Sequence, residues 1–122
     1  MPERTPPAPT ESRVFESLAA AAWGPMMDAA RAVDDPSKDG GSCNLDHCLI
    51  APTNKARVTK KMVERLNGAG CSYSIVQRYG RSCLTPNVYF AGQGANNTRV
   101  CEAMAKAANA IGLDAWVMYV TD

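Results

Sequence analysis

The chain has 122 residues, the length of one ordinary domain. Hydrophobic residues make up 46% of it and charged residues 20%, so a packed core is possible and a wholly disordered chain is excluded. A formal net charge of +1 argues against a protein that coats long nucleic acids or binds membranes through a polybasic surface, and no apolar run approaches the roughly 18 residues of a membrane helix.

The cysteine count predicts a cellular compartment. Five is an odd number, and the cysteines are scattered, whereas a secreted disulfide framework is usually even and local. The N-terminus lacks the basic and then apolar pattern of a secretory signal. We therefore expect a soluble cytoplasmic protein with reduced thiols and no membrane partner.

Charge is distributed unevenly along the chain. Residues 1–39 hold four basic and seven acidic groups, and residues 40–122 hold nine basic and five acidic groups. A local cluster of cations attracts anions even where the global charge is close to zero. The second part of the chain is therefore the expected place for a small anionic ligand.

The N-terminal region reads as an arm followed by helices. Residues 1–9 contain four of the eight prolines, which predicts a flexible, extended arm. Thr10 can cap a helix that begins at Glu11 and carries one apolar stripe. Gly24 and Pro25 are expected to interrupt this helix, and a second short helix is predicted over residues 25–34.

The composition of residues 34–41 is typical of a linker. It divides the chain into an arm at 1–9, a helical segment with its linker at 10–39, and an α+β domain at 40–122. Inside that domain the patterns alternate, and the predicted elements are a strand at 43–51, a helix at 57–67, a strand at 71–79, a turn at 80–82, a strand to residue 91 with Pro86 near its start, a helix at 97–111 and a strand at 115–120. The βαββαβ order predicts a ferredoxin-like antiparallel sheet with helices on one face.

Residues 90–99 carry the strongest functional pattern, a strand that passes through a glycine-rich loop into a helix. Gly92 and Gly94 allow an anion to approach the backbone, and the first-turn N–H groups point towards it. Thr98 and Arg99 add donors that fit phosphate. The other candidate ligand contacts here are Gln93, Asn96 and Asn97. An ordinary loop with an asparagine cap fits the same pattern, which is neither a Walker loop nor GxGxxG.

Further candidates lie in the predicted strand and hairpin. Asn44 and Asp46 share one face of strand 43–51, where they can contact ribose or base, although a polar outer face is the simpler alternative. Tyr79 and Tyr89 could stack on a base.

Catalysis and metal binding are less well supported by the sequence. His47 is the only histidine, and together with Cys43 and Cys48 it lacks the second ligand pair of a zinc site. A cysteine nucleophile would have to use His47, and no nucleophile-elbow pattern accompanies any cysteine. We expect no metal and no cofactor, and a small Cys/His hydrolase remains an alternative.

Two motifs resemble a known family. GGSCNLD at 40–46, with GQG, NTR and CEAMAKA within 92–107, is similar to small phage and prophage proteins that pair GG-[ST]-C-N-x-D with G-Q-G-x-x-x-T-R and an alanine-rich helix. In size, context and α+β build these resemble phage anti-defence sponges against Thoeris and CBASS immunity.

The resemblance implies a non-enzymatic role. It predicts a homo-oligomer in the infected host cell that sequesters a cyclic nucleotide or cyclic ADP-ribose signal without cleaving it. The alternative from the residues is an inhibitor that contacts a host defence enzyme through its acidic N-terminal helices.

Overall fold

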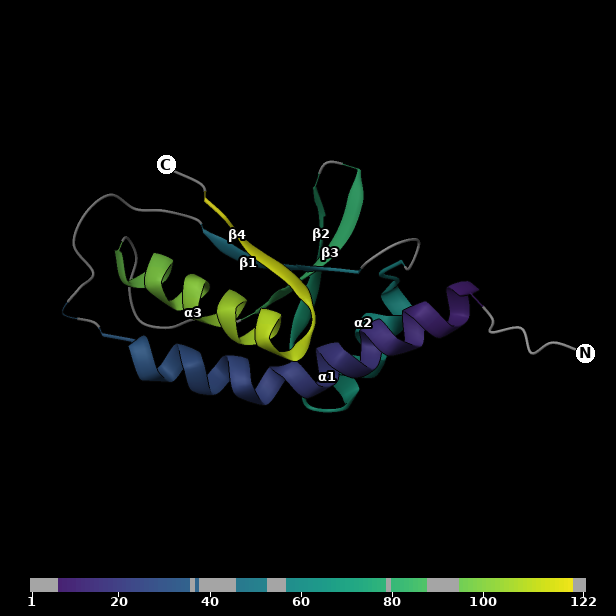
Figure 1. Ribbon diagram of the computed structural model, residues 1–122, viewed down its shortest axis with the longest axis horizontal. Helices are drawn as coiled ribbons and strands as arrows, with labels where there is room; N and C mark the ends of the chain where they lie inside the picture. Colours follow the sequence, from purple (N-terminus) through teal and green to yellow (C-terminus); the bar gives the residue numbers. More distant parts are fainter. Residues whose placement is uncertain are drawn as a thin grey trace, which may run out of the picture.

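A four-stranded antiparallel sheet and three helices make up the computed structural model (Figure 1). It describes residues 7–35, 37, 46–52, 57–78, 80–87 and 95–119, apart from the side chains of 7–11 and 95. The elements are α1 (Pro7–Val33), β1 (His47–Ala51), α2 (Lys60–Gly68), β2 (Tyr73–Arg78), β3 (Arg81–Pro86), α3 (Ala95–Ile111) and β4 (Asp114–Met118).

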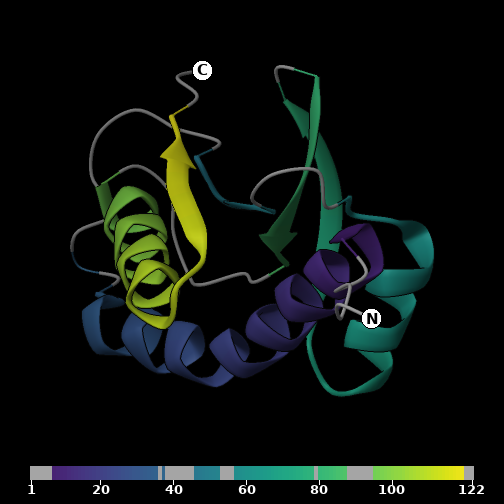
Figure 2. The same cartoon turned by 45° about the vertical axis from the view of Figure 1, so that its right-hand side comes forward.

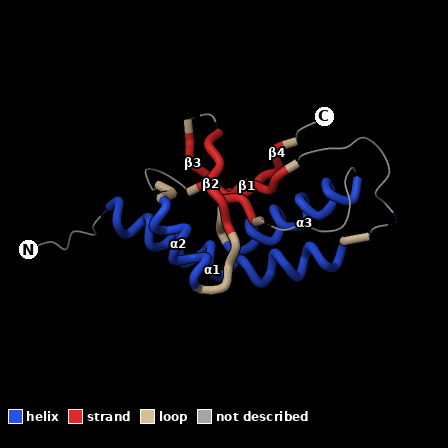
Figure 3. The backbone as a smooth tube through the Cα atoms, turned by 180° about the vertical axis from the view of Figure 1, so that it is seen from behind, coloured by secondary structure: helices blue, strands red, loops and turns tan. Residues whose placement is uncertain are grey.

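The predicted fold class is confirmed. The strands lie in the order β2-β3-β1-β4 and all pair antiparallel, as expected for a ferredoxin-like βαββαβ unit. The helices lie on one side of the strands (Figure 3). Among the described residues no helix is both long and apolar enough to cross a membrane.

α1 corrects two predictions. It begins at Pro7, so the extended arm predicted for 1–9 is wrong for its last three residues, and it continues through Gly24 and Pro25, so the predicted interruption is also wrong. Residues 1–6 lie outside the described part of the chain. Figure 2 shows one curved helix in place of two.

Packing explains why Pro25 is tolerated. Pro25 and Ala21 are both exposed, so water can reach the Ala21 carbonyl that Pro25 cannot satisfy. Buried side chains occur before and after the proline, and they are Phe15, Ala19, Ala22, Met26, Met27 and Ala30. Burial of the apolar side chains on both sides of Pro25 stabilises a continuous α1 by more than the proline destabilises it. The predicted segment 10–39 therefore shares one hydrophobic cluster with the α+β part.

The β2–β3 hairpin shifts another predicted boundary. Arg78 lies opposite Arg81, so the strands pair up to a short hairpin connection, and Gly80 in it has a φ of 74°, which favours glycine. β3 therefore begins at Arg81, inside the predicted turn, and Pro86 is its last residue instead of an early one. Val88 and Phe90, which were expected in this strand, lie outside the described residues.

The α2–β2 and α3–β4 connections share an arrangement that the sequence analysis missed. Near the end of α2, Asn67 exchanges two hydrogen bonds with the backbone of Tyr73, at 2.8 and 3.1 Å. Near the end of α3, Asn109 does the same with Ala115, at 2.9 and 3.0 Å. A glycine with positive φ lies three residues after each asparagine, at Gly70 and Gly112. The two halves of the βαββαβ unit thus repeat a local sequence pattern.

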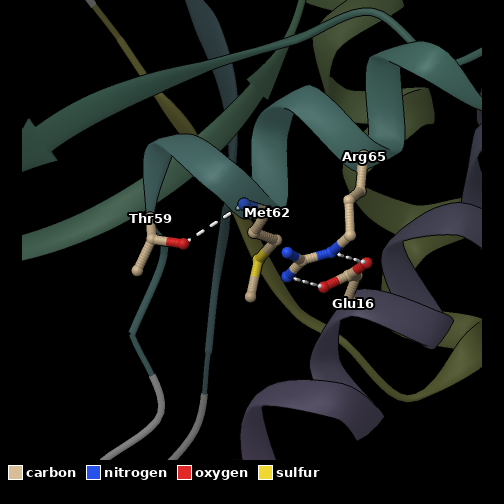
Figure 4. A network of polar contacts seen from close by, with 4 residues as sticks. All are labelled: Glu16, Thr59, Met62 and Arg65. Carbon is tan, nitrogen blue, oxygen red and sulfur yellow. Dashed lines mark hydrogen bonds and ion pairs between the residues drawn. The ribbon is translucent and has the colours of Figure 1, made fainter.

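A paired contact fixes α2 against α1. The Arg65 guanidinium donates two hydrogen bonds to the Glu16 carboxylate, at 2.7 and 2.9 Å, and the Thr59 hydroxyl caps α2 by accepting the Met62 N–H (Figure 4). The hydrogen bond from Arg65 lowers the pKa of Glu16 and outweighs burial, which raises it. This contact joins the middle of α1 to α2.

Candidate functional site

Hydrogen bonds of the Asn96 side chain hold the N-terminus of α3 against the C-terminus of α1. The Asn96 side chain is 1% exposed. Its Nδ2 donates to Asp34 Oδ1 at 2.8 Å, and its Oδ1 accepts the Asp35 N–H at 2.9 Å. The ligand contact predicted for Asn96 would require these bonds to open.

The same end of α3 is also held by hydrogen bonds to Asp46, the residue before β1. Asp46 is 8% exposed, and its Oδ2 accepts the Thr98 hydroxyl at 2.7 Å. Its backbone carbonyl accepts Asn97 Nδ2 at 3.5 Å and Cys101 Sγ at 3.4 Å. The structure thus brings together three of the candidate ligand contacts, Asp46, Asn97 and Thr98, and Asp46 forms hydrogen bonds to the other two.

Arg99 lies beyond these contacts, on the next position of α3. Its Nη1 atom is shielded from solvent and meets no hydrogen-bond acceptor in the part of the chain that the structure describes. Structures rarely leave a charged donor in that state, because it loses water and gains nothing in return. Nη1 of Arg99 is therefore a shielded donor for which the described residues supply no acceptor.

Six candidate residues lie outside the described part of the chain, so their predicted roles stay predictions. They are Asn44, Tyr79, Tyr89, Gly92, Gln93 and Gly94. Sequence reasoning also missed two residues at this site, Asp34 and Asp35, which it assigned to a linker. Their position at the end of a predicted helix was the available signal.

The buried thiols are poor nucleophiles. Burial, followed by the nearby Cys101 thiol, raises the pKa of Cys48 from 9.0 to about 12. Burial, followed by the negative charge of Asp46, raises the pKa of Cys101 from 9.0 to about 12. Exposed His47 and buried Cys48 are successive residues of β1, so their side chains point to opposite faces of the sheet. This arrangement does not form a Cys/His pair.

Thiol labelling tests this arrangement. In a Cys43→Ser background, we expect Cys48 and Cys101 of the native protein to react with iodoacetamide at pH 8 at least about 100-fold more slowly than in urea, because few thiols are ionised. Raised pKa values mean that the native rate keeps climbing towards pH 12, whereas the unfolded rate levels off above pH 9. Mass spectrometry of quenched samples measures both rates. Equal labelling rates in the native and the unfolded protein at pH 8 would contradict the raised pKa values of Cys48 and Cys101.

Comparisons with known proteins do not assign the chain to a family. The chain matches no protein-family model, no curated protein and no solved structure. Within the described residues, no three side chains among His, Cys, Asp and Glu are grouped so that they could hold a metal ion.

Proposed function

We propose that this chain binds a small anionic nucleotide through Arg99 and retains it without cleaving it. The supporting observation is the shielded Nη1 atom of Arg99, which lacks an acceptor among the described residues. A ligand phosphate oxygen supplies that acceptor in a charge-assisted hydrogen bond, a contact that suits the planar guanidinium.

The biological role in this proposal follows the resemblance to phage anti-defence proteins. The ligand is a cyclic nucleotide or cyclic ADP-ribose immune signal, and a homo-oligomer sequesters it in the cytoplasm of the infected host cell. Sequestration requires affinity alone, so it needs neither a reactive thiol nor a cofactor.

The two alternatives receive less support. A Cys/His hydrolase is disfavoured because the Cys48 and Cys101 thiols stay protonated at neutral pH. An inhibitor that docks through acidic α1 is disfavoured because two of the acids on this helix, Glu16 and Asp28, already pair with Arg65 and Arg31.

Mass spectrometry tests the central proposal. The protein is purified from cells that express a nucleotide-signalling defence system, and heat denaturation then releases the ligand. We expect an intact nucleotide in stoichiometric amounts. Turnover products in place of the intact molecule would support the hydrolase, and a co-purified host enzyme without nucleotide would support the inhibitor.

Calorimetry with the released nucleotide tests Arg99. We expect Arg99→Ala to weaken binding at least tenfold, about 1.4 kcal/mol, which is within the range for a hydrogen bond to a charged group. Its unliganded stability should stay within about 1 kcal/mol of the parent, since Nη1 donates no hydrogen bond to the described residues. Lys106→Ala, an exposed cation two turns further along α3, is the matched control. Unchanged affinity in Arg99→Ala would remove Arg99 from the site.

A further inference from the structure

We infer that Arg57 forms a second anion site, at the position in the first half of the βαββαβ unit that Arg99 occupies in the second half. The inference rests on the proposed function, because it gives Arg57 the same class of ligand, a phosphate group of a small molecule. It is carried by a sequence repeat in which every other shared residue has a structural role.

The repeat has the pattern R-V-x3-M-x4-N-x2-G. It covers residues 57–70 and residues 99–112, without a gap in either copy. Each copy runs through a helix, α2 or α3, and ends just before the strand that follows it, β2 or β4 (Figure 1). Five positions therefore carry the same amino acid in both halves of the unit.

The fold explains four of these positions. The valines and methionines share burial in the helix-side core, and they are Val58, Met62, Val100 and Met104. The asparagines and glycines share the α2–β2 and α3–β4 connections, and they are Asn67, Gly70, Asn109 and Gly112. Close packing selects the first group and backbone geometry selects the second. None of these residues requires a ligand to explain its identity.

The arginine is the shared residue that the fold does not explain. Arg57 is exposed and precedes Thr59, the N-cap of α2. In the part of the chain that the structure describes, the Arg57 guanidinium meets neither a hydrogen-bond acceptor nor a carboxylate. The Nη1 atom of Arg99 likewise lacks an acceptor there. Both copies therefore keep a cation that the described residues do not use, which supports an anionic ligand for each.

Two further cations follow Arg57 closely in the sequence. Lys60 and Lys61 are exposed and begin α2, whose first acidic residue is Glu64. A local cluster of positive charges attracts a phosphate group more strongly than one charge alone. Salt screens exposed charges more effectively than shielded ones, and the Nη1 atom of Arg99 is shielded. The Arg57 site is therefore expected to be the weaker and the more salt-sensitive of the two.

A nuclear magnetic resonance titration of the full chain with inorganic pyrophosphate tests the inference. We expect the backbone amide signals of residues 57–61 to shift as pyrophosphate is added. Arg57→Ala should weaken this binding at least about threefold, the effect of losing one exposed ion pair. Arg13→Ala, which removes an exposed cation of α1 outside the repeat, is the matched control and should leave the binding unchanged. Raising the salt concentration from about 50 to about 500 mM should reverse the shifts.

The outcomes separate the inference from the proposed function. Absence of shifts at residues 57–61, or shifts that Arg57→Ala leaves unchanged, would overturn the inference, and nucleotide binding that depends on Arg99 would still keep the proposed function. Shifts that depend on Arg57, without any nucleotide binding that depends on Arg99, would overturn the proposed function and keep Arg57 as an anion site. Because Arg57 is exposed, its replacement should leave the fold intact, and the same spectra check this directly.

Discussion

Replacing Tyr73 with alanine is expected to destabilise the protein by about 3–5 kcal/mol, the usual cost of removing a large aromatic side chain from a core. Tyr73 is 1% exposed and joins β2 to α1. Its hydroxyl donates to the Ala19 carbonyl at 2.7 Å, and its ring meets Trp23 edge-on with centroids 5.1 Å apart. The residue therefore connects the sheet to the first helix through both a hydrogen bond and a ring contact.

Two further tyrosine variants separate the contribution of the Tyr73 hydroxyl from that of its ring. Tyr73→Phe keeps the ring and loses the hydroxyl bond, so it should cost about 1 kcal/mol. Tyr119→Ala removes a tyrosine that is 61% exposed and should cost about 0.5 kcal/mol or less. Urea unfolding followed by circular dichroism measures all three. A loss below about 1 kcal/mol for Tyr73→Ala would show that α1 does not depend on this residue.

The sequence pattern predicted the fold class because periodicity reports which side chains are buried. Tyr73 and Ile75 lie two residues apart in β2, and Val100 and Met104 repeat at helical spacing in α3. All four pack in the helix-side core. Helix breaks are harder to predict. Whether Pro25 ends a helix depends on what packs on either side of it, and this information lies in distant residues.

The candidate site was predictable in part for the same reason. A glycine-rich loop that enters a helix is a local pattern, so Asn96, Asn97, Thr98 and Arg99 could be identified from it. The partners of these residues come from distant parts of the chain, since Asp34 is 62 residues from Asn96 and Asp46 is 52 from Thr98. Only tertiary structure shows that three of the four side chains hold the helix and that Nη1 of Arg99 meets no acceptor among the described residues.

Exchanging Asn96 and Asp34 is expected to reveal how much the fold depends on their contact. Asn96→Ala should cost about 2–4 kcal/mol, because it removes a hydrogen bond to a charged group and a second to the Asp35 N–H at a buried position. Asn96→Asp should be comparably destabilising, since two carboxylates then face each other in place of a donor and an acceptor.

Asp34→Asn supplies the complementary half of the exchange. The new amide can still accept from Asn96, so the single change should cost about 1 kcal/mol, the loss of charge assistance. When Asp34→Asn and Asn96→Asp are combined, the amide at position 34 donates to the carboxylate at position 96. That carboxylate still accepts the Asp35 N–H, and its charge now lies at a helix N-terminus, where it is favourable. Stability should return to within about 1 kcal/mol of the parent.

A double-mutant cycle measured by urea unfolding gives the coupling between the two positions. We expect at least about 2 kcal/mol, because the second change repairs what the first one breaks. Additive losses would mean that the two side chains act independently, and the contact between α1 and α3 at this point would then contribute little. Strong coupling would instead establish that the bond between positions 34 and 96 holds the N-terminal end of α3 against α1.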